Sequence, residues 1–410
     1  MGQYQTKYGL PESVYFCTSC VMSNQRPTSA VEFKHTIESK KTTMHIDKAG
    51  VCDACRVAEE KAKIDWKARE EQLLQLLDKH RSKDGSYDCL VPGSGGKDSA
   101  YQAHILKYKY GMNPLTVTWP PILYTEYGYK NWKNWVDSGF DNITFTRNGK
   151  VMKLLTRLSI ENLLHPFQTF MLGQKNLGPK IAAQYGISLI FYGENETEYG
   201  NPLAENATSL RDKSYYSFKH MDEIFLGGVS VKELKEKHGL KDGDILPYLP
   251  VQAEDVTRTN LEVHYLGYYL RWTPQEVYYY AVDNTGFKAR PFRTQGTYSK
   301  YNSIDDKIDD LHYYTSFIKF GLGRASHDAA QEIRNRHITR EEGVALVKRF
   351  DGEFPDRYFN EVMDYLEMKP ERFHELCSEF RSEHLWGKDA AGNWQLRHNV
   401  WGGGLNDIKG

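Results

Sequence analysis

Short apolar runs alternate with helical segments over residues 87–192, and this alternation is the clearest signal along the chain. The apolar runs have the length of buried strands, whereas the segments between them carry apolar residues at helical spacing. Strands that alternate with helices predict βαβ crossovers and therefore a parallel sheet. The expected strands are 87–91, 115–119, 142–146 and 187–192, and the expected helices are 100–109, 130–138 and a long stretch at 150–185.

The pattern changes after about residue 255, where helical spacing dominates and we find no convincing strand. One more helix is expected near the N-terminus, at 57–82, where Ile64, Trp66 and Leu73 recur among charged residues. The expected C-terminal helices are 260–271, 274–283, 303–320, 326–335, 340–350 and 355–380.

These changes divide the 410 residues into four parts. Residues 1–60 hold two cysteine pairs, and residues 61–255 form the α/β domain. Residues 256–400 are a helical region that we expect to bind substrate or a partner, and residues 401–410 are a flexible tail.

The charge of the chain is nearly balanced, because 53 Lys and Arg residues face 54 Asp and Glu residues. The chain therefore lacks the overall positive charge of a non-specific nucleic-acid binder, and a local basic groove is the alternative that this balance leaves open. No apolar run reaches the roughly 18 residues of a membrane span, and the N-terminus lacks the apolar core of a signal peptide. We therefore expect a cytoplasmic protein without a membrane or nucleic-acid partner. The 28 tyrosines suit either core packing or stacking on sugars and bases.

Four of the six cysteines form two Cys-x-x-Cys pairs, Cys17 with Cys20 and Cys52 with Cys55. Four thiolates satisfy tetrahedral Zn²⁺, so the spacing predicts a structural zinc site of the ribbon type with a hairpin between the pairs. A redox or sulfur-carrying role is the alternative. The other two cysteines, at 89 and 377, lie in an expected strand and an expected helix and are interpreted as core residues.

The strongest motif is Pro-Gly-Ser-Gly-Gly-Lys-Asp-Ser at 92–99, between an expected strand and an expected helix. Its glycines let several backbone N–H groups converge beside the positive end of the helix dipole, and the hydroxyls of Ser94 and Ser99 add donors. The loop is therefore suited to an anion such as pyrophosphate. It is not a Walker A sequence, and a tight turn without a ligand is the alternative.

Ser-Gly-Gly-Lys-Asp-Ser at 94–99 resembles the PP-loop of the ATP pyrophosphatase superfamily, whose members cleave ATP between the α and β phosphates and adenylylate a carbonyl oxygen. Three further features narrow the match to one family within this superfamily. They are the cysteine unit (residues 1–60), Tyr-Gly-Glu-Asn-Glu at 192–196 and Arg-Thr-Gln-Gly-Thr-Tyr-Ser-Lys at 293–300. Together these are similar to the N-acetyl sugar amidotransferases of bacterial surface polysaccharide and O-antigen biosynthesis, which include PseA-like and WbpG-like proteins. The resemblance runs from about residue 15 to about residue 390.

The resemblance implies a doubly wound sheet with ATP at the carboxyl ends of its strands, and a C–N ligase reaction. A sugar acetamido group would be adenylylated by Mg²⁺-ATP and then converted to an acetamidino group by ammonia. A separate glutaminase, similar to the glutaminase and barrel subunits of imidazole-glycerol-phosphate synthase, would supply the ammonia to a sugar or nucleotide-sugar substrate.

The resemblance also implies roles for single residues. Glu194 follows a strand and would hold Mg²⁺ or orient the acetamido nitrogen, although a solvated loop carboxylate is an equal reading. Asp98, Ser99 and Glu194 are the expected catalytic residues. The expected ATP-binding residues are Ser94, Gly95, Gly96, Lys97, Asp98 and Ser99, and the expected substrate-binding residues are Asn195, Arg293 and Lys300.

Two other functions stay open at this point. A tRNA thiolase would also combine a PP-loop with cysteine pairs, but the net charge of −1 argues against it. A non-catalytic zinc-ribbon and nucleotide-binding module is the second alternative, and the intact loop residues Ser94, Asp98 and Ser99 argue against that.

Overall fold

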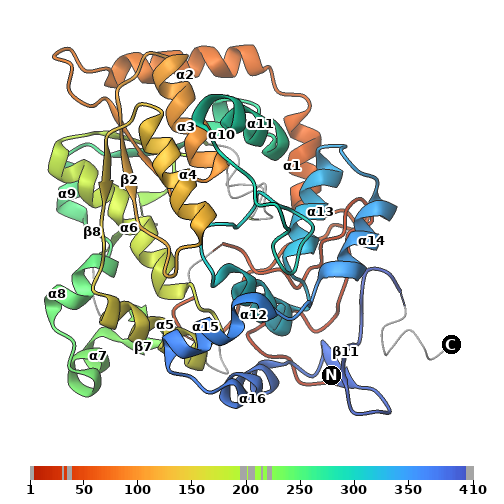
Figure 1. Ribbon diagram of the computed structural model, residues 1–410. Helices are drawn as coiled ribbons and strands as arrows, with labels where there is room; N and C mark the ends of the chain where they lie inside the picture. The colour runs from red at the N-terminus through yellow and green to blue at the C-terminus, as the bar shows by residue number, and fades with distance from the viewer. Residues whose placement is uncertain are drawn as a thin grey trace.

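A parallel five-stranded sheet lies on one side of the molecule in the computed structural model (left in Figure 1). The structure describes residues 4–29, 32–34, 39–193, 201, 208–213, 216–218 and 224–402. In spatial order the strands are β3 (Asn142–Thr144), β2 (Pro114–Thr118), β1 (Cys89–Pro92), β4 (Leu189–Tyr192) and β9 (Glu262–Tyr265). Each neighbouring pair is parallel, which confirms the predicted α/β class.

Both faces of the sheet are covered, because alternate strand residues enter two different cores. Leu90 and Ile190 pack toward α5 (Gly149–Leu163), α6 (Gln168–Tyr185) and α9 (Ala253–Arg258). Val91 and Phe191 pack toward the opposite layer. That layer consists of α2 (Trp66–His80), α3 (Lys97–Tyr108), α4 (Glu126–Asp137), α10 (Leu266–Tyr269) and α11 (Pro274–Thr285).

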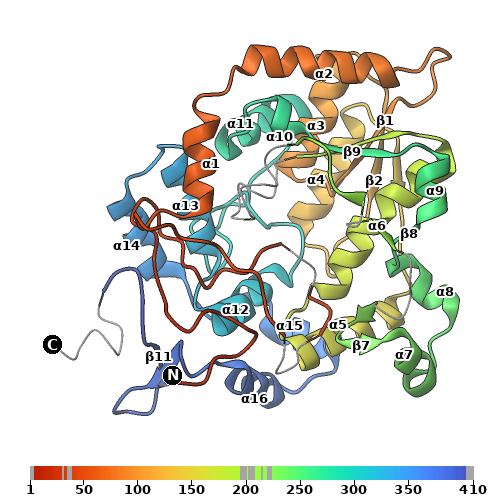
Figure 2. The same cartoon turned by 180° about the vertical axis from the view of Figure 1, so that it is seen from behind.

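Five helices follow α11 and form the C-terminal region: α12 (Asp309–Phe320), α13 (Arg324–Arg334), α14 (Arg340–Phe350), α15 (Asp356–Leu366) and α16 (Pro370–Phe380). A hairpin of β10 (Trp386–Lys388) and β11 (Trp394–Leu396) closes the region. The cysteine unit packs into the same core, since Cys17 and Met44 cluster with Leu366 and Phe373. Figure 2 shows the N-terminal segment (red) beside α12, α13 and α14. The two ends of the sequence therefore fold against each other.

Smaller elements lie in the segment of the chain between β4 and β9. The helical ones are α7 (Val231–His238), α8 (Asp242–Ile245) and the 3-10 turn at Leu246–Tyr248. The short strands are β5 (Ser217–Phe218), β6 (Phe225–Leu226), β7 (Val229–Ser230) and β8 (Val251–Gln252). Within the described ranges, none of the helices is both long enough and apolar enough to cross a bilayer.

The prediction of a helix at 260–271 was wrong, because this segment contains β9 followed directly by α10. With only four residues, β9 is too short to establish a period of two before the helix begins. The hairpin β10–β11 was also missed. Three predicted long helices are each divided: 57–82 into α1 (Asp53–Lys61) and α2, 150–185 into α5 and α6, and 355–380 into α15 and α16.

Local backbone geometry explains these breaks. Asp65 caps α2 by accepting hydrogen bonds from the N–H groups of residues 67 and 68. Leu164 and Glu367 end α5 and α15 in left-handed conformations, with φ of 45° and 53°.

Candidate active site

The glycine loop joins β1 to α3 at the carboxyl edge of the sheet. Gly95 adopts φ +81°, and a Cβ atom there would lie 2.4 Å from the Trp132 Cα. A Cβ atom at Gly93 would lie 2.1 Å from the Ser99 Cβ. Glycine is therefore required at both positions. At Gly95 both the positive φ and the lack of space exclude a side chain, and at Gly93 the lack of space alone does so. The result is an open backbone turn directly before the N-terminus of a 12-residue helix, which favours a bound anion.

Side chains of the loop already interact with one another. The Lys97 ammonium lies 2.7 Å from both carboxylate oxygens of Asp98. Lys97 is nearly buried, whereas the Asp98 side chain is 38 % exposed. The Ser99 hydroxyl donates to the Gly96 carbonyl at 3.1 Å. Lys97 therefore neutralises its neighbour in this structure, and the exposed side of Asp98 stays accessible.

The strand order places the loop at the point where the chain changes direction. From β1 the chain runs outward to β2 and β3, and it returns to the other side of β1 for β4 and β9. In open α/β sheets, ligands bind in the crevice outside the carboxyl ends of the strands at such a switch point. The loop follows β1 and borders this crevice.

A cavity of about 240 Å³ fills the crevice, and we call it the sheet cavity. Its lining includes Gly93 of the loop, Trp119 directly after β2, Tyr192 at the end of β4 and Gln174 of α6. Arg211 also lines it, and its guanidinium lies over the Tyr192 ring at 5.1 Å from the centroid. The cavity therefore offers flat aromatic rings and a positive charge.

A second cavity of about 440 Å³ also borders the loop, and we call it the helix cavity. Ser94 lines it from the loop, and Gln174 lines both cavities. The opposite wall comes from α12 and α13 and includes Asp309, Tyr313, Arg324 and Asp328. The glycine loop thus contributes to the lining of two neighbouring cavities.

The polar wall of the helix cavity is held in place by a small network. The Arg324 Nε donates to the Asp328 Oδ1 at 2.8 Å, and the Arg324 Nη1 donates to the Tyr313 hydroxyl at 3.1 Å. The Thr297 hydroxyl donates to the Asp328 Oδ2 at 2.6 Å. Burial, with Asp305 and Asp306 nearby, raises the pKa of Asp309 well above 3.8, so this carboxyl favours its protonated form. The lining of the cavity thus combines hydrogen-bond donors with the carboxyl groups of four aspartates, at 305, 306, 309 and 328.

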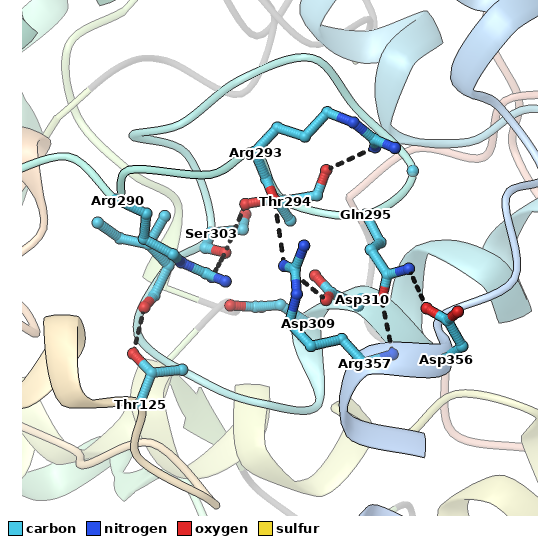
Figure 3. Close-up of polar contacts among 12 residues, drawn as sticks. Thr125, Arg290, Arg293, Thr294, Gln295, Ser303, Asp309, Asp310, Asp356 and Arg357 are labelled. Carbon is cyan, nitrogen blue, oxygen red and sulfur yellow. Dashed lines mark hydrogen bonds and ion pairs between the residues drawn. The ribbon is translucent and has the colours of Figure 1, made fainter.

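The predicted substrate-binding residues lie in different surroundings. Arg293 forms a bidentate ion pair with Glu353, with both N···O distances 2.6 Å. In Figure 3 its guanidinium points away from Asp309, and the Arg357 guanidinium donates to the Arg293 carbonyl at 3.1 Å. Lys300 is exposed, and its carbonyl accepts from the Arg290 N–H at 2.9 Å.

Glu194 and Asn195 lie outside the described residues. Their predicted roles remain predictions. The same holds for the roles predicted for the loop residues 94–99, Arg293 and Lys300.

Sequence reasoning missed the polar wall of the helix cavity. Arg324 and Asp328 stand four residues apart on α13, which is a common spacing for surface ion pairs. Only the tertiary fold, which brings α13 and Ser94 of the loop to the same cavity, makes this pair part of a cavity lining. Gln174 had no sequence signal either, because it lies in the middle of α6 without a motif.

The four paired cysteines form a compact metal site. Their Sγ atoms all lie within 4.8 Å of one another, with 3.9 Å between Cys17 and Cys55 and 3.7 Å between Cys20 and Cys52. Tetrahedral Zn²⁺ with Zn–S bonds of about 2.3 Å requires similar separations. The N–H groups of Cys20 and Cys52 point to the Cys17 sulfur at 3.4 and 3.3 Å, as metal-bound thiolates prefer. The cluster fits a structural zinc ion.

The metal site is tied to the helices. The Arg340 guanidinium, at the start of α14, donates to the carbonyls of Cys20 and Cys17 at 3.1 and 3.3 Å. Cys89 and Cys377 are buried and separate from the cluster, in agreement with their interpretation as core residues.

A family model described as "LPS biosynthesis protein WbpG-like, C-terminal domain" matches residues 295–400. The chain carries a WbpG-like C-terminal domain. This domain contains α12 to α16 and the hairpin, and it supplies Asp309, Tyr313, Arg324 and Asp328 to the helix cavity. The glycine loop lies outside the WbpG-like domain, so the cavity joins the two parts of the chain.

No protein of curated function matches the chain in sequence. Three solved structures share a weak likeness with it. A predicted subunit of tRNA methyltransferase from Methanocaldococcus jannaschii has 14 % identity and a TM-score of 0.25, over 56 % of this chain and 85 % of that one. NMN synthetase from Francisella tularensis has 15 % identity and a TM-score of 0.26, over 48 % and 92 %. The U34-tRNA thiolase NcsA from Methanococcus maripaludis, with its [4Fe-4S] cluster, has 10 % identity and a TM-score of 0.28, over 78 % and 90 %.

Proposed function

We propose that the chain is the synthetase subunit of an ATP-dependent amidotransferase that converts a sugar acetamido group to an acetamidino group in surface polysaccharide biosynthesis. One observation carries the proposal. Ser94 of the glycine loop opens into a polar cavity whose far wall belongs to the WbpG-like domain. An anion cradle and a site for a polar acceptor are therefore neighbours, as a group transfer between ATP and a sugar requires.

ATP fits the loop and the sheet cavity. The loop N–H groups and the start of α3 suit the pyrophosphate part of the nucleotide, and the exposed side of Asp98 lies beside them. The rings of Trp119 and Tyr192 in the sheet cavity suit a base. Mg²⁺ would accompany ATP and neutralise phosphate charge, and Glu194 is the ligand proposed for it.

The chemistry proceeds in two substitutions. The amide oxygen attacks the α-phosphorus, the bond to pyrophosphate breaks, and an O-adenylyl imidate forms. The nitrogen lone pair of ammonia then attacks the imidate carbon, the bond between that carbon and the AMP oxygen breaks, and one proton of ammonia is released. The sugar thus exchanges O for NH, and AMP carries the oxygen away. Adenylylation is needed because an amide oxygen is otherwise a poor leaving group.

The chain's own residues would position the two reactants. Arg324, Asp328 and the Tyr313 hydroxyl offer the hydrogen bonds that sugar hydroxyls need. Protonated Asp309 can donate to the acceptor without adding charge. Catalysis of this kind is mainly positioning and charge neutralisation.

The ammonia source in this proposal is a separate glutaminase subunit, similar to the glutaminase and barrel pair described above. The substrates, ATP and a sugar or nucleotide sugar, place the reaction in the cytoplasm.

The test is ATP turnover to AMP with ammonium chloride, across a panel of UDP- and CMP-linked acetamido sugars. We expect AMP release that depends on one sugar, and a product with the mass expected for replacement of O by NH. AMP release that depends on tRNA instead would contradict the proposal and support the thiolase alternative. Failure to bind ATP in calorimetry would support the non-catalytic alternative.

A further inference from the structure

A third cavity, of about 160 Å³, adjoins the helix cavity on the side of the cysteine unit, and we call it the side cavity. The two cavities share a wall made of Met171, His312, Ser316, Leu322 and His327. The outer end of the side cavity is lined by partly exposed residues of the cysteine unit, among them Thr28, Ser29 and Lys41. A line of cavity space therefore runs from the cysteine unit to the glycine loop.

The shared wall is polar but uncharged. Burial lowers the pKa of both His312 and His327 well below 6.5, so both imidazoles are neutral at pH 7. The His312 Nδ1 is buried and has no hydrogen-bond partner among the described residues. Met171 and Leu322 make the rest of the wall apolar. A small neutral molecule that both donates and accepts hydrogen bonds matches this lining.

The charged side chains of the side cavity lie outside the wall that it shares with the helix cavity. The Lys319 ammonium contacts both Glu32 oxygens at 3.0 and 3.2 Å, and the Lys41 ammonium lies 3.1 Å from the same carboxylate. Arg26 and His165 are the other ionisable groups of the lining. The shared wall thus contains no Lys, Arg, Asp or Glu side chain, whereas the rest of the lining does.

We propose that the side cavity conducts ammonia from the face of the cysteine unit to the helix cavity. The inference rests on the proposed function, which requires ammonia at the adenylylated amide. Ammonia is mostly protonated in neutral water, and ammonium has no lone pair for the attack. A passage walled by neutral imidazoles and apolar side chains keeps ammonia unprotonated and keeps water away from a hydrolysable intermediate.

A competing route is smaller. A cavity of about 20 Å³ between α1 and α13 meets the helix cavity only at Gln331. That volume holds about one water molecule, whereas the side cavity has eight times the volume and shares five residues with the helix cavity.

The experiment separates the two half-reactions. ATP–pyrophosphate exchange that depends on the acceptor sugar reports adenylylation and needs no ammonia, whereas AMP release with ammonium chloride reports both steps. Ser316→Leu fills the shared wall, and Thr28→Phe fills the side cavity at its outer end without touching the helix cavity. Ser316→Ala is the conservative control, and Ser378→Leu makes the matched change at an exposed position of α16.

We expect Thr28→Phe to retain exchange within about twofold and both filling variants to raise the KM for ammonium chloride about tenfold at constant pH, while both controls stay at the unmodified value. An unchanged KM in Thr28→Phe with exchange retained would overturn the passage, even if Ser316→Leu disturbed the acceptor. Absence of acceptor-dependent exchange in the unmodified chain would overturn the proposed function first, and the passage with it.

Discussion

The Arg324 Nε donates to the Asp328 Oδ1 at 2.8 Å within the same cavity that Ser94 of the glycine loop lines. This ion pair belongs to the WbpG-like domain, whereas Ser94 belongs to the α/β sheet domain. Asp328 is buried, so a change in either partner alters the hydrogen-bonding surface of the cavity.

Arg324→Gln should therefore weaken acceptor binding. We expect the KM for the acceptor sugar to rise at least about tenfold, with the KM for ATP within about twofold of the unmodified value. Initial-rate kinetics with each substrate varied in turn measure both values. Arg372→Gln is the matched control, because Arg372 pairs with Glu375 and Glu379 on an exposed surface. Equal effects on ATP and acceptor would contradict this placement of the acceptor.

Gly95→Ala should abolish most ATP turnover. A methyl group there meets the backbone at Trp132, and φ +81° is strained for alanine. Since a displacement of about 1 Å can cost about 100-fold in rate, we expect a loss of that size in AMP formation. Gly85→Ala is the control, since Gly85 has φ +83° with no atom within 4 Å of a Cβ. If Gly85→Ala lost as much activity, the loop geometry would not be the cause.

Zinc content should be about one ion per chain, and Cys52→Ser should lose it. Because the cysteine unit shares a core with α15 and α16, we expect the variant also to unfold at a lower temperature than the unmodified chain. Metal analysis and thermal denaturation give the two readouts. Cys377→Ala should keep its zinc, since Cys377 lies outside the cluster. A chain without zinc that unfolds normally would contradict the structural role.

The Arg293–Glu353 pair permits a test of the substrate role predicted for Arg293. The pair is partly exposed, so Arg293→Gln and Glu353→Gln should each destabilise the fold by about 1 kcal/mol. If the role of Arg293 is structural, the two variants have the same acceptor KM. A rise in acceptor KM confined to Arg293→Gln would instead establish substrate binding. Chemical denaturation and acceptor kinetics on both variants supply the comparison.

Asp310 should make stability depend on pH. Burial raises the pKa of Asp310 from 3.8 to about 6, although the Arg290 and Arg357 guanidinium groups act in the opposite direction, and the Arg357 Nη1 lies 3.8 Å from the Asp310 Oδ2. Between these two values the folded chain holds a proton that the unfolded chain has lost, so this residue's contribution to stability falls as pH rises through that window. We expect the free energy of unfolding of Asp310→Asn, relative to the unmodified chain, to increase between pH about 4 and about 6. A constant difference across this range would contradict the raised pKa.

The sequence predicted those parts of the molecule that local patterns determine. Four of the five sheet strands, the glycine loop and the four cysteine ligands were all recognisable, because each has its own spacing. β9 was not recognised, because its four residues lead directly into α10 and are too few to show the alternating pattern of a strand. The joint core of Cys17 with Phe373, and the polar wall at Arg324 and Asp328, depend on contacts between distant segments that local spacing does not encode.

The central claim is that the acetamido oxygen is activated by adenylylation at the glycine loop. Its most direct test uses an acceptor sugar whose acetamido oxygen carries a heavy isotope, incubated with ATP, Mg²⁺ and ammonium chloride. Mass spectrometry of the nucleotide products then locates the label. Adenylylation predicts one labelled oxygen in the phosphate of AMP for each acetamidino group formed, whereas label in inorganic phosphate or pyrophosphate, or AMP without label, would contradict it.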